Sequence, residues 1–224
     1  FFIDRVLPFG LRSAPFICQR VTNAIIYLYR HAGYYGLNYL DDIGGVDTTD
    51  KAHSAFAYLE SLFERLGVDE AIDKAVPPTH RMIFLGIMFD TQTMTMSVPP
   101  DKMKEIVDIL CIWQNKKFAS KTEVQSLIGK LQFAAKCVRP GRVFISRMLE
   151  HLRTIHSLAK RIQVRLPSEF LKDVHWWRTF ISRYNGISMI PYQLWSRTDT
   201  VIATGACLSG CGAYSRTLGV FFHS

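Results

Sequence analysis

Apolar residues in the first part of the chain recur first at helical and then at strand spacing. Between Ser13 and Gly33 they return every three to four positions, which predicts a helix with Ser13 as its N-cap and Pro15 in its first turn. The same spacing predicts a second helix from about residue 50 to 66, closed by Gly67. Two helices are therefore expected before residue 70.

Two segments of this part have the composition of strands. "YYGLNYLDDIGGV" (34–46) predicts a strand, a tight turn at Asp41 and Asp42, and a second strand. "MIFLGIMFD" (82–90) predicts one buried strand, and "MTMSV" (94–98) is its expected hairpin partner. Residues 1–98 therefore have a mixed α/β pattern.

The pattern becomes helical after Pro99 and Pro100. Three further apolar faces follow, and residues from about 100 to 185 are expected to be mainly helical. These faces comprise Met103, Ile106, Val107, Leu110 and Trp113; Val124, Leu127, Ile128 and Leu131; and Ile145, Met148, Leu149, Leu152 and Ile155. From about residue 194 the chain is glycine-rich and predicts strands again.

Charge divides the chain at about the same place. Of 224 residues, 48% are hydrophobic and the net charge is +8. Residues 1–100 carry 8 Lys and Arg against 11 Asp and Glu, whereas residues 101–224 carry 19 against 8. A basic second half suits a polyanion such as a nucleic acid, although it is also compatible with a solvated basic helical face. The longest apolar runs fall far short of the ~20 residues that span a bilayer, so no membrane partner is expected.

The adjacent carboxylates of Asp41 and Asp42 are the most specific chemical feature. Carboxylates in a segment that otherwise resembles a buried strand are costly unless a cation or hydrogen-bond donors compensate them. At a hairpin tip both could reach one region of solvent and suit Mg²⁺, which takes one or two protein carboxylates together with substrate phosphates. An isolated pair of aspartates is more often an ordinary surface turn.

The order of several motifs favours the first interpretation. "LPFGLRSAPF" (7–16), one helix, "YLDD" (39–42) and then "FLG" (84–86) together resemble the reverse transcriptase family. Downstream, "VPPDKMKEI", "LIGKLQFAAKCVRPGR" and "VHWWRTFISRYNGIS" resemble the segments that follow the palm in DIRS-type retrotransposon polyproteins. The resemblance covers nearly the whole chain, which we expect to be truncated at both ends relative to its parent.

The resemblance implies an α+β fold. Residues 1–98 would be a partial right-hand polymerase palm, an antiparallel sheet with helices on one face. Residues 99–190 would be a helical thumb and connection, and residues 191–224 the first strands of a ribonuclease H-like domain. The implied activity is RNA-directed DNA synthesis with Mg²⁺ or Mn²⁺ as cofactor. The implied partners are an RNA template, a DNA primer, their RNA–DNA hybrid and a dNTP.

The resemblance also implies roles for individual residues. Asp41 would be a direct ligand of a metal pair and Asp42 a supporting one, which would activate the primer 3′-hydroxyl and stabilise the leaving pyrophosphate. Lys74 would be a general acid or a phosphate contact, or else an ordinary surface lysine. Leu85 and Gly86 would form a primer grip.

Two further groups would contact substrate or nucleic acid. Residues expected at the nucleotide and template are Pro8, Phe9, Gly10 and Tyr39, with Gly10 allowing close approach of the backbone. Residues expected at the phosphates of the hybrid are Lys121, Lys130, Lys136, Arg139 and Arg142. Trp176 and Trp177, in contrast, are more typical of a helical core than of base stacking.

The chain departs from the family pattern in two places. The family's third carboxylate comes from a strand well upstream of "LPFGL", and Asp4 is too close to that loop to replace it. Gly205 in "ATGACLSGCGAYS" stands where a ribonuclease H strand carries an Asp, and Asp199 is too early to substitute. We therefore expect no ribonuclease H activity and no polymerase activity from this chain alone.

Alternatives to a catalytic fragment remain open. One is a domesticated, non-catalytic nucleic-acid-binding protein that uses the basic helices, and another is a decayed reading frame that makes no functional protein. Five cysteines without a CxxC pair suggest reduced thiols in an intracellular protein, and both the cytoplasm and the nucleus would suit the family.

Overall fold

The computed structural model describes residues 7–8, 10–157, 159, 161–190, 200–207 and 210–223. The chain divides into two compact units, Phe1–Ile187 and Ser188–Ser224. Asp4, Phe9 and Asp199, which the sequence singled out, lie outside the described residues. Within the described part of the chain, no helix has the length and apolarity needed to cross a bilayer.

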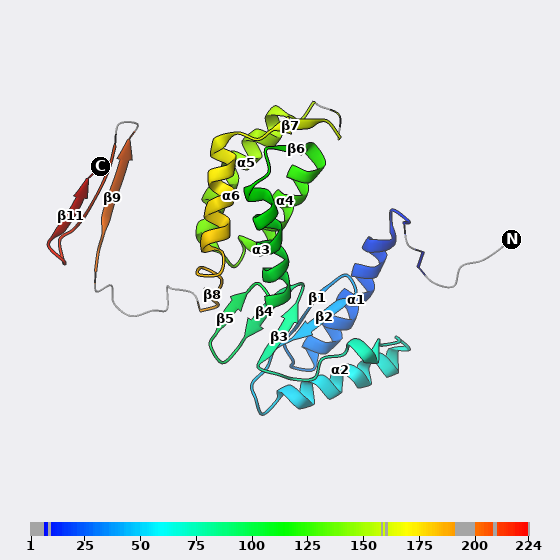
Figure 1. Ribbon diagram of the computed structural model, residues 1–224. Coiled ribbons are helices and arrows are strands. Elements are labelled where there is room, and N and C mark those ends of the chain that lie inside the picture. Colours follow the sequence, from blue (N-terminus) through cyan, green and yellow to red (C-terminus); the bar gives the residue numbers. More distant parts are fainter. Residues whose placement is uncertain are drawn as a thin grey trace. The chain divides into compact units, whose positions relative to one another are not determined.

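The first elements of Phe1–Ile187 are two helices and a hairpin (Figure 1). They are α1 (Ala14–His31), β1 (Gly36–Tyr39), β2 (Asp42–Gly45) and α2 (Ala52–Leu66). Both predicted helices are confirmed. Gly67 ends α2 in the left-handed conformation with φ 64°, as the sequence predicted. Ser13 occupies the N-cap position of α1, but its side chain makes no capping hydrogen bond, because its backbone is already in the helical region.

This hairpin region has a small core of its own. Its buried residues come from α1 and α2, and aromatic and apolar side chains pack around them. The buried set is Ile25, Ile26, Tyr29, Ala55 and Leu62, and the packing set is Tyr34, Ile43, Tyr58, Leu59 and Phe63. The rings of Tyr29, Tyr34 and Tyr58 lie within 5.2–6.2 Å of one another, so this core is largely aromatic.

A short 3₁₀ helix, η1 (Ile72–Lys74), precedes a four-stranded sheet of order β3-β4-β5-β8. Its strands are β3 (Arg81–Phe84), β4 (Ile87–Asp90), β5 (Thr95–Ser97) and β8 (Ile187–Ser188). "MIFLGIMFD" is thus a hairpin rather than one buried strand, because Leu85 and Gly86 turn the chain with φ of 49° and 75°. The predicted pairing with "MTMSV" is confirmed by the register Asp90↔Thr95.

The helical region follows, with α3 (Pro100–Gln114), α4 (Lys121–Ala134), η2 (Arg139–Arg142), α5 (Val143–Thr154) and α6 (Ser168–Phe180). The sequence did not reveal the short antiparallel pair β6 (Phe118–Ser120) and β7 (Gln163–Arg165). The large buried side chains of this region include Leu110, Leu127, Leu131, Phe170 and Trp177. This core also takes in Ile87 of β4 and Val98.

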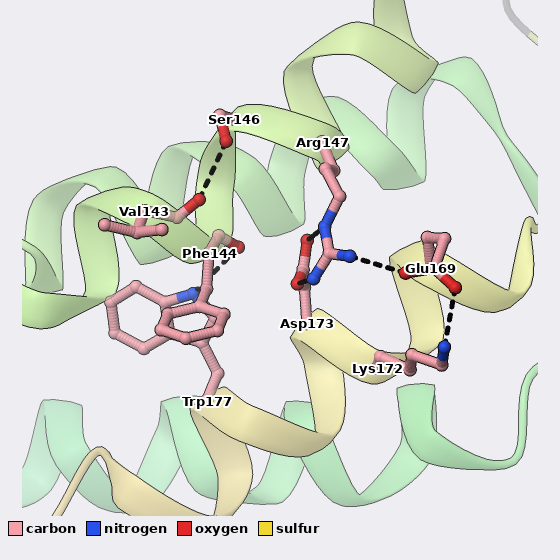
Figure 2. Close-up of polar contacts among 8 residues, drawn as sticks. All are labelled: Val143, Phe144, Ser146, Arg147, Glu169, Lys172, Asp173 and Trp177. Carbon is pink, nitrogen blue, oxygen red and sulfur yellow. Dashed lines mark hydrogen bonds and ion pairs between the residues drawn. The ribbon is translucent and has the colours of Figure 1, made fainter. Parts of the chain in front are cut away.

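Polar contacts between α5 and α6 accompany this packing (Figure 2). Asp173 is fully buried, with 0% of its side chain exposed, and it accepts two hydrogen bonds from Arg147. Arg147 also pairs with Glu169 at 2.5 Å, and Glu169 pairs with Lys172 at 2.7 Å. Trp177 donates its indole N–H to the carbonyl of Phe144 at 3.3 Å. The buried carboxylate of α6 is therefore compensated by a cation from α5.

The unit Ser188–Ser224 contains a three-stranded antiparallel sheet of order β11-β10-β9. Its strands are β9 (Ala203–Cys207), β10 (Gly210–Ser215) and β11 (Val220–His223). Every residue of β9 and β11 is exposed. The strand prediction for the tail is confirmed by these three strands.

Candidate functional site

Asp41 and Asp42 lie at the tip of the β1–β2 hairpin. The strands pair in the register Gly36↔Gly45 to Tyr39↔Asp42, so the connecting loop consists of Leu40 and Asp41. The turn is thus one residue earlier than predicted, and Asp42 is the first residue of β2. Both aspartates are exposed. The predicted hairpin is confirmed, with one carboxylate in its loop and the next at the start of a strand.

A row of polar side chains on α1 holds this hairpin in place. Asn38 donates its amide to Thr22 Oγ1 at 2.8 Å and to Asn23 Oδ1 at 2.9 Å. Gln19 Oε1 accepts the backbone N–H of Leu40 at 2.8 Å. Leu40 has φ 53°, a left-handed conformation that costs a non-glycine residue about 1 kcal/mol or more. The bond from Gln19 satisfies the backbone at that strained position, next to Asp41.

Glycines allow the hairpin to pack closely on aromatic rings. A Cβ on Gly36 would lie 2.9 Å from two ring atoms of Tyr29 in α1. A Cβ on Gly44 would lie 3.0–3.2 Å from the ring of Phe84 in β3. Burial raises the pKa of the Tyr29 hydroxyl, and Asp47 and Tyr34 raise it further, so the phenol under the hairpin stays neutral. The backbone of the aspartate hairpin is therefore fixed from α1 and from β3.

The donor set at the tip suits a hard cation, but it is small. Two exposed carboxylates offer the oxygen ligands that Mg²⁺ prefers, leaving positions for water and phosphate oxygens. Among the described residues, no group of three or more His, Cys, Asp or Glu side chains is placed to hold a metal. Asp41 and Asp42 thus fit a weak site that needs further oxygen ligands.

The other residues expected at the nucleotide come from different elements of the chain. Gly10 has φ 88°, and a Cβ added to it would meet no atom within 4 Å, so its backbone conformation is what requires glycine. Tyr39 is 57% exposed and pairs with Asp42. Lys74 is exposed at the end of η1. Pro8 is half-buried, and Phe9 lies outside the described residues. Their roles toward a nucleotide stay predictions.

The expected primer grip is a tight turn. Leu85 is 45% exposed, and both Leu85 and Gly86 have positive φ, the combination found in two-residue hairpin turns. The ammonium of Lys102 and the ring of Phe133 lie against this turn, where a Cβ on Gly86 would overlap the ammonium and come within 3.2 Å of the ring. The Leu85–Gly86 turn thus has an exposed apolar tip and a close-packed glycine, and its role as a primer grip stays a prediction.

The five residues expected to contact phosphates differ in their surroundings. Lys121 donates to the carbonyl of His156 at 2.6 Å, and Lys130 pairs with Glu105 at 2.5 Å. Lys136, Arg139 and Arg142 are exposed, and the Lys136 ammonium lies 5.3 Å from the centre of the Phe133 ring. The ammonium groups of Lys121 and Lys130 thus each already donate to an oxygen of the protein, which leaves other N–H donors of both groups for a phosphate.

Gln19, Thr22 and Asn23, which position the hairpin, were not predicted from the sequence. Their signal was present, since they are spaced by three and four positions and share one face of α1. The apolar spacing that predicted the helix contains no information about its polar face. In the second unit, Gly205 lies in β9 with nothing within 4 Å of a Cβ, so its surroundings leave room for a side chain.

No protein-family model matches the chain. It is 23% identical over 209 residues to polyprotein P3 of Commelina yellow mottle virus, a match that spans 93% of this chain and 10% of the polyprotein. Its structure resembles a foamy viral protease-reverse transcriptase in complex with double-stranded DNA, with TM-score 0.62, 15% identity and coverage of 97% of this chain and 36% of that one.

Two related structures give the same result. A second foamy viral protease-reverse transcriptase with double-stranded DNA has TM-score 0.61 at 14% identity, covering 96% of this chain and 42% of that one. A foamy viral protease-reverse transcriptase in complex with an RNA/DNA hybrid has TM-score 0.54 at 14% identity, covering 97% of this chain and 28% of that one. The chain therefore has the fold of part of a viral reverse transcriptase, and it spans less than half of the length of each of these relatives.

Proposed function

We propose that the chain is the part of an RNA-directed DNA polymerase that carries the aspartate hairpin and the thumb. In this assignment 1–98 is part of the palm, 99–190 the thumb and connection, and 191–224 the start of a ribonuclease H-like domain of a DIRS-type retrotransposon. The observation that carries it is the hairpin that presents Asp41 and Asp42 on a chain with the fold of viral reverse transcriptases. Its substrates are an RNA template, a DNA primer and a dNTP.

In this proposal Asp41 and Asp42 would hold Mg²⁺ or Mn²⁺ at the site that binds the dNTP. The chemistry that such a metal would supply is activation of the primer 3′-hydroxyl and stabilisation of the charge on the leaving pyrophosphate. The protein's own contribution is to fix the hairpin, through Gln19, Thr22 and Asn23, so that both carboxylates stay in place. Lys74 contacts a phosphate of the departing group.

The small donor set limits what the chain does alone. Adjacent carboxylates without a third acidic ligand hold Mg²⁺ weakly, and the described residues supply none. We therefore expect this chain to bind RNA–DNA primer–template but to extend the primer only when another segment completes the site. It acts inside the cell, where template and nucleotides are present.

The experiment combines binding and metal titration of the full chain. Fluorescence anisotropy measures affinity for an RNA–DNA primer–template against salt, and electron paramagnetic resonance of Mn²⁺ measures metal binding with and without dGTP. We expect hybrid binding that weakens with salt, and Mn²⁺ binding that Asp41→Asn removes. Absence of hybrid binding would contradict the proposal. Primer extension abolished by Asp41→Asn would overturn the expectation that the chain is inactive alone.

A non-catalytic nucleic-acid-binding protein is the second candidate, favoured by the lack of a third acidic ligand among the described residues and by the exposed cations of the helical region. It predicts the same hybrid binding, unchanged by Asp41→Asn, and no Mn²⁺ binding at the hairpin. Asp41→Asn as a matched, nearly isosteric variant therefore separates the two candidates in one titration series.

A further inference from the structure

The Phe133 ring of α4 lies beside the Leu85–Gly86 turn and has two lysine ammonium groups near it, one from α3 and one from the segment after α4. Lys102, in the first turn of α3, has its ammonium 4.5 Å from the centre of the Phe133 ring. Lys136, just after α4, has its ammonium 5.3 Å from the same ring. Lys102 was not among the basic residues singled out from the sequence. Residues far apart in the chain thus bring two positive charges to one ring.

The Lys102 ammonium also lies directly against the turn. A Cβ on Gly86 would overlap the Lys102 Nζ and would lie 3.2 Å from the Phe133 ring. Because a lysine end is flexible, the clash itself could be relieved by moving Lys102 away, but Gly86 also has φ 75°, which disfavours any other residue. The absence of a side chain on Gly86 therefore allows the Lys102 ammonium to lie directly against the backbone of the turn.

Neither ammonium has a carboxylate partner within the described part of the chain. Glu105, the acidic residue one turn after Lys102, is engaged at 2.5 Å by Lys130. Lys130 is also the leading cause that lowers the pKa of Glu105, and Lys102 is a lesser one. A cation over a ring near solvent gains only about 0.5–1 kcal/mol. Two like charges at one ring, neither of them in an ion pair within the described part of the chain, therefore form a positive site that an anion would complete.

We propose that Lys102 and Lys136, positioned by Phe133, form a binding site for backbone phosphates of a nucleic acid beside the Leu85–Gly86 turn. This inference rests on the proposed function, which supplies a nucleic acid at that turn. The ligand is a phosphodiester backbone, DNA or RNA, because flexible ammonium groups recognise charge and carry no base specificity. Phe133 orients the two lysines, so it is a positioning residue.

The first experiment compares matched charge removals in the full chain. Lys102→Ala, Lys136→Ala and the double variant remove cations of the proposed site. Lys104→Ala is the control, because it removes an exposed cation of α3 that is not one of the two lysines at the Phe133 ring. For each site lysine we expect about a 5-fold loss of affinity for an RNA–DNA hybrid, and a log–log salt slope reduced by about 1. Lys104→Ala is expected to leave the slope unchanged. Phe133→Leu keeps both charges and should therefore weaken hybrid binding less than Lys102→Ala or Lys136→Ala does.

The second experiment locates the ligand without substitutions. Acetylation of lysines, followed by mass spectrometry with and without bound hybrid, should show protection of Lys102 and Lys136 but not of Lys104. Equal protection of all three lysines, or equal effects of Lys102→Ala and Lys104→Ala on affinity, would show that the proposed phosphate site is wrong. The proposed function would still stand in that case, provided that the chain binds the hybrid. If the wild-type chain binds no hybrid, both the site and the proposed function are wrong.

Discussion

The hairpin region and the helical region bury very different amounts of apolar surface. Among the described residues, five buried hydrophobic side chains form the core around α1 and α2, whereas twenty-two form the core that includes α3 to α6. α1 leaves Phe16 65% and Val21 52% exposed. The hairpin is instead held by side-chain hydrogen bonds to α1 and by glycines packed on aromatic rings. The helical region with its larger core and the hairpin held by polar contacts should therefore respond differently to substitution.

The largest effect is expected at the centre of the helical core. Trp177 has 0% exposure and its indole bonds to the Phe144 carbonyl. Trp177→Ala should lower the free energy of unfolding by about 4 kcal/mol, because it leaves a large cavity and an unpaired carbonyl. Chemical denaturation measures this. Trp176→Ala, at a half-buried position, is the control, and an equal loss there would contradict the packing described.

The buried carboxylate on α6 should give the next effect. Arg147→Ala removes the cation that compensates Asp173, and we expect a loss of about 3 kcal/mol at pH 7. Burial already raises the pKa of Asp173, against the opposing effect of Arg147. Without Arg147 the pKa of Asp173 rises further, so the destabilisation should grow as pH rises from the unfolded-state pKa of about 4 through the raised folded-state pKa.

Stability measured at pH 4 and pH 7 tests this sign. The deficit of Arg147→Ala should be smaller at pH 4, where Asp173 can bind a proton in the folded state. Asp173→Asn removes the charge itself and should flatten that dependence. A deficit that is the same at both pH values in Arg147→Ala would show that the carboxylate is not isolated when its partner is removed.

A pair of glycine substitutions sharpens the contrast between the two regions. Gly36→Ala would place a Cβ 2.9 Å from the Tyr29 ring, and should cost about 1–3 kcal/mol through overpacking. Gly129→Ala, in α4 with nothing within 4 Å, should instead stabilise by up to about 1 kcal/mol. Amide hydrogen exchange should show faster opening of β1–β2 only in Gly36→Ala. The two substitutions should change the free energy of unfolding in opposite directions, and a change in the same direction would contradict the packing described.

The smallest effect concerns the capping box of α4, in which the side chains of Ser120 and Glu123 each accept the other's backbone N–H. Contacts from Lys116 and then Ser120 lower the pKa of Glu123 to about 2. A lowered folded-state pKa gives stability that is present above the unfolded value of about 4.3 and is lost as pH falls toward 2. Glu123 is 39% exposed, so solvent screening keeps the effect below about 1 kcal/mol. The stability difference between wild type and Glu123→Gln should vanish at low pH.

Much of the fold could be predicted from the sequence. Periodic helices and the Asp41–Asp42 hairpin were found because apolar spacing and local turn signals determine them. The β3–β4 turn was missed from the pattern, since its tip is the apolar pair Leu85–Gly86 and carries no polar turn residue. Gln19 and Lys102 were also missed, because their importance comes from partners distant in the chain. Local signals determine the elements, and tertiary contacts decide which polar side chains meet.

Cleavage mapping with Fe²⁺ in place of Mg²⁺ tests the central claim most directly. Iron held by Asp41 and Asp42 would generate hydroxyl radicals in the presence of ascorbate and peroxide, and these would cut the nearest nucleotides of a bound, end-labelled primer–template. We predict cuts concentrated at the primer 3′ end that disappear in Asp41→Asn while hybrid affinity is retained. Cuts spread along the hybrid, or unchanged in Asp41→Asn, would contradict the claim that this hairpin faces the primer terminus.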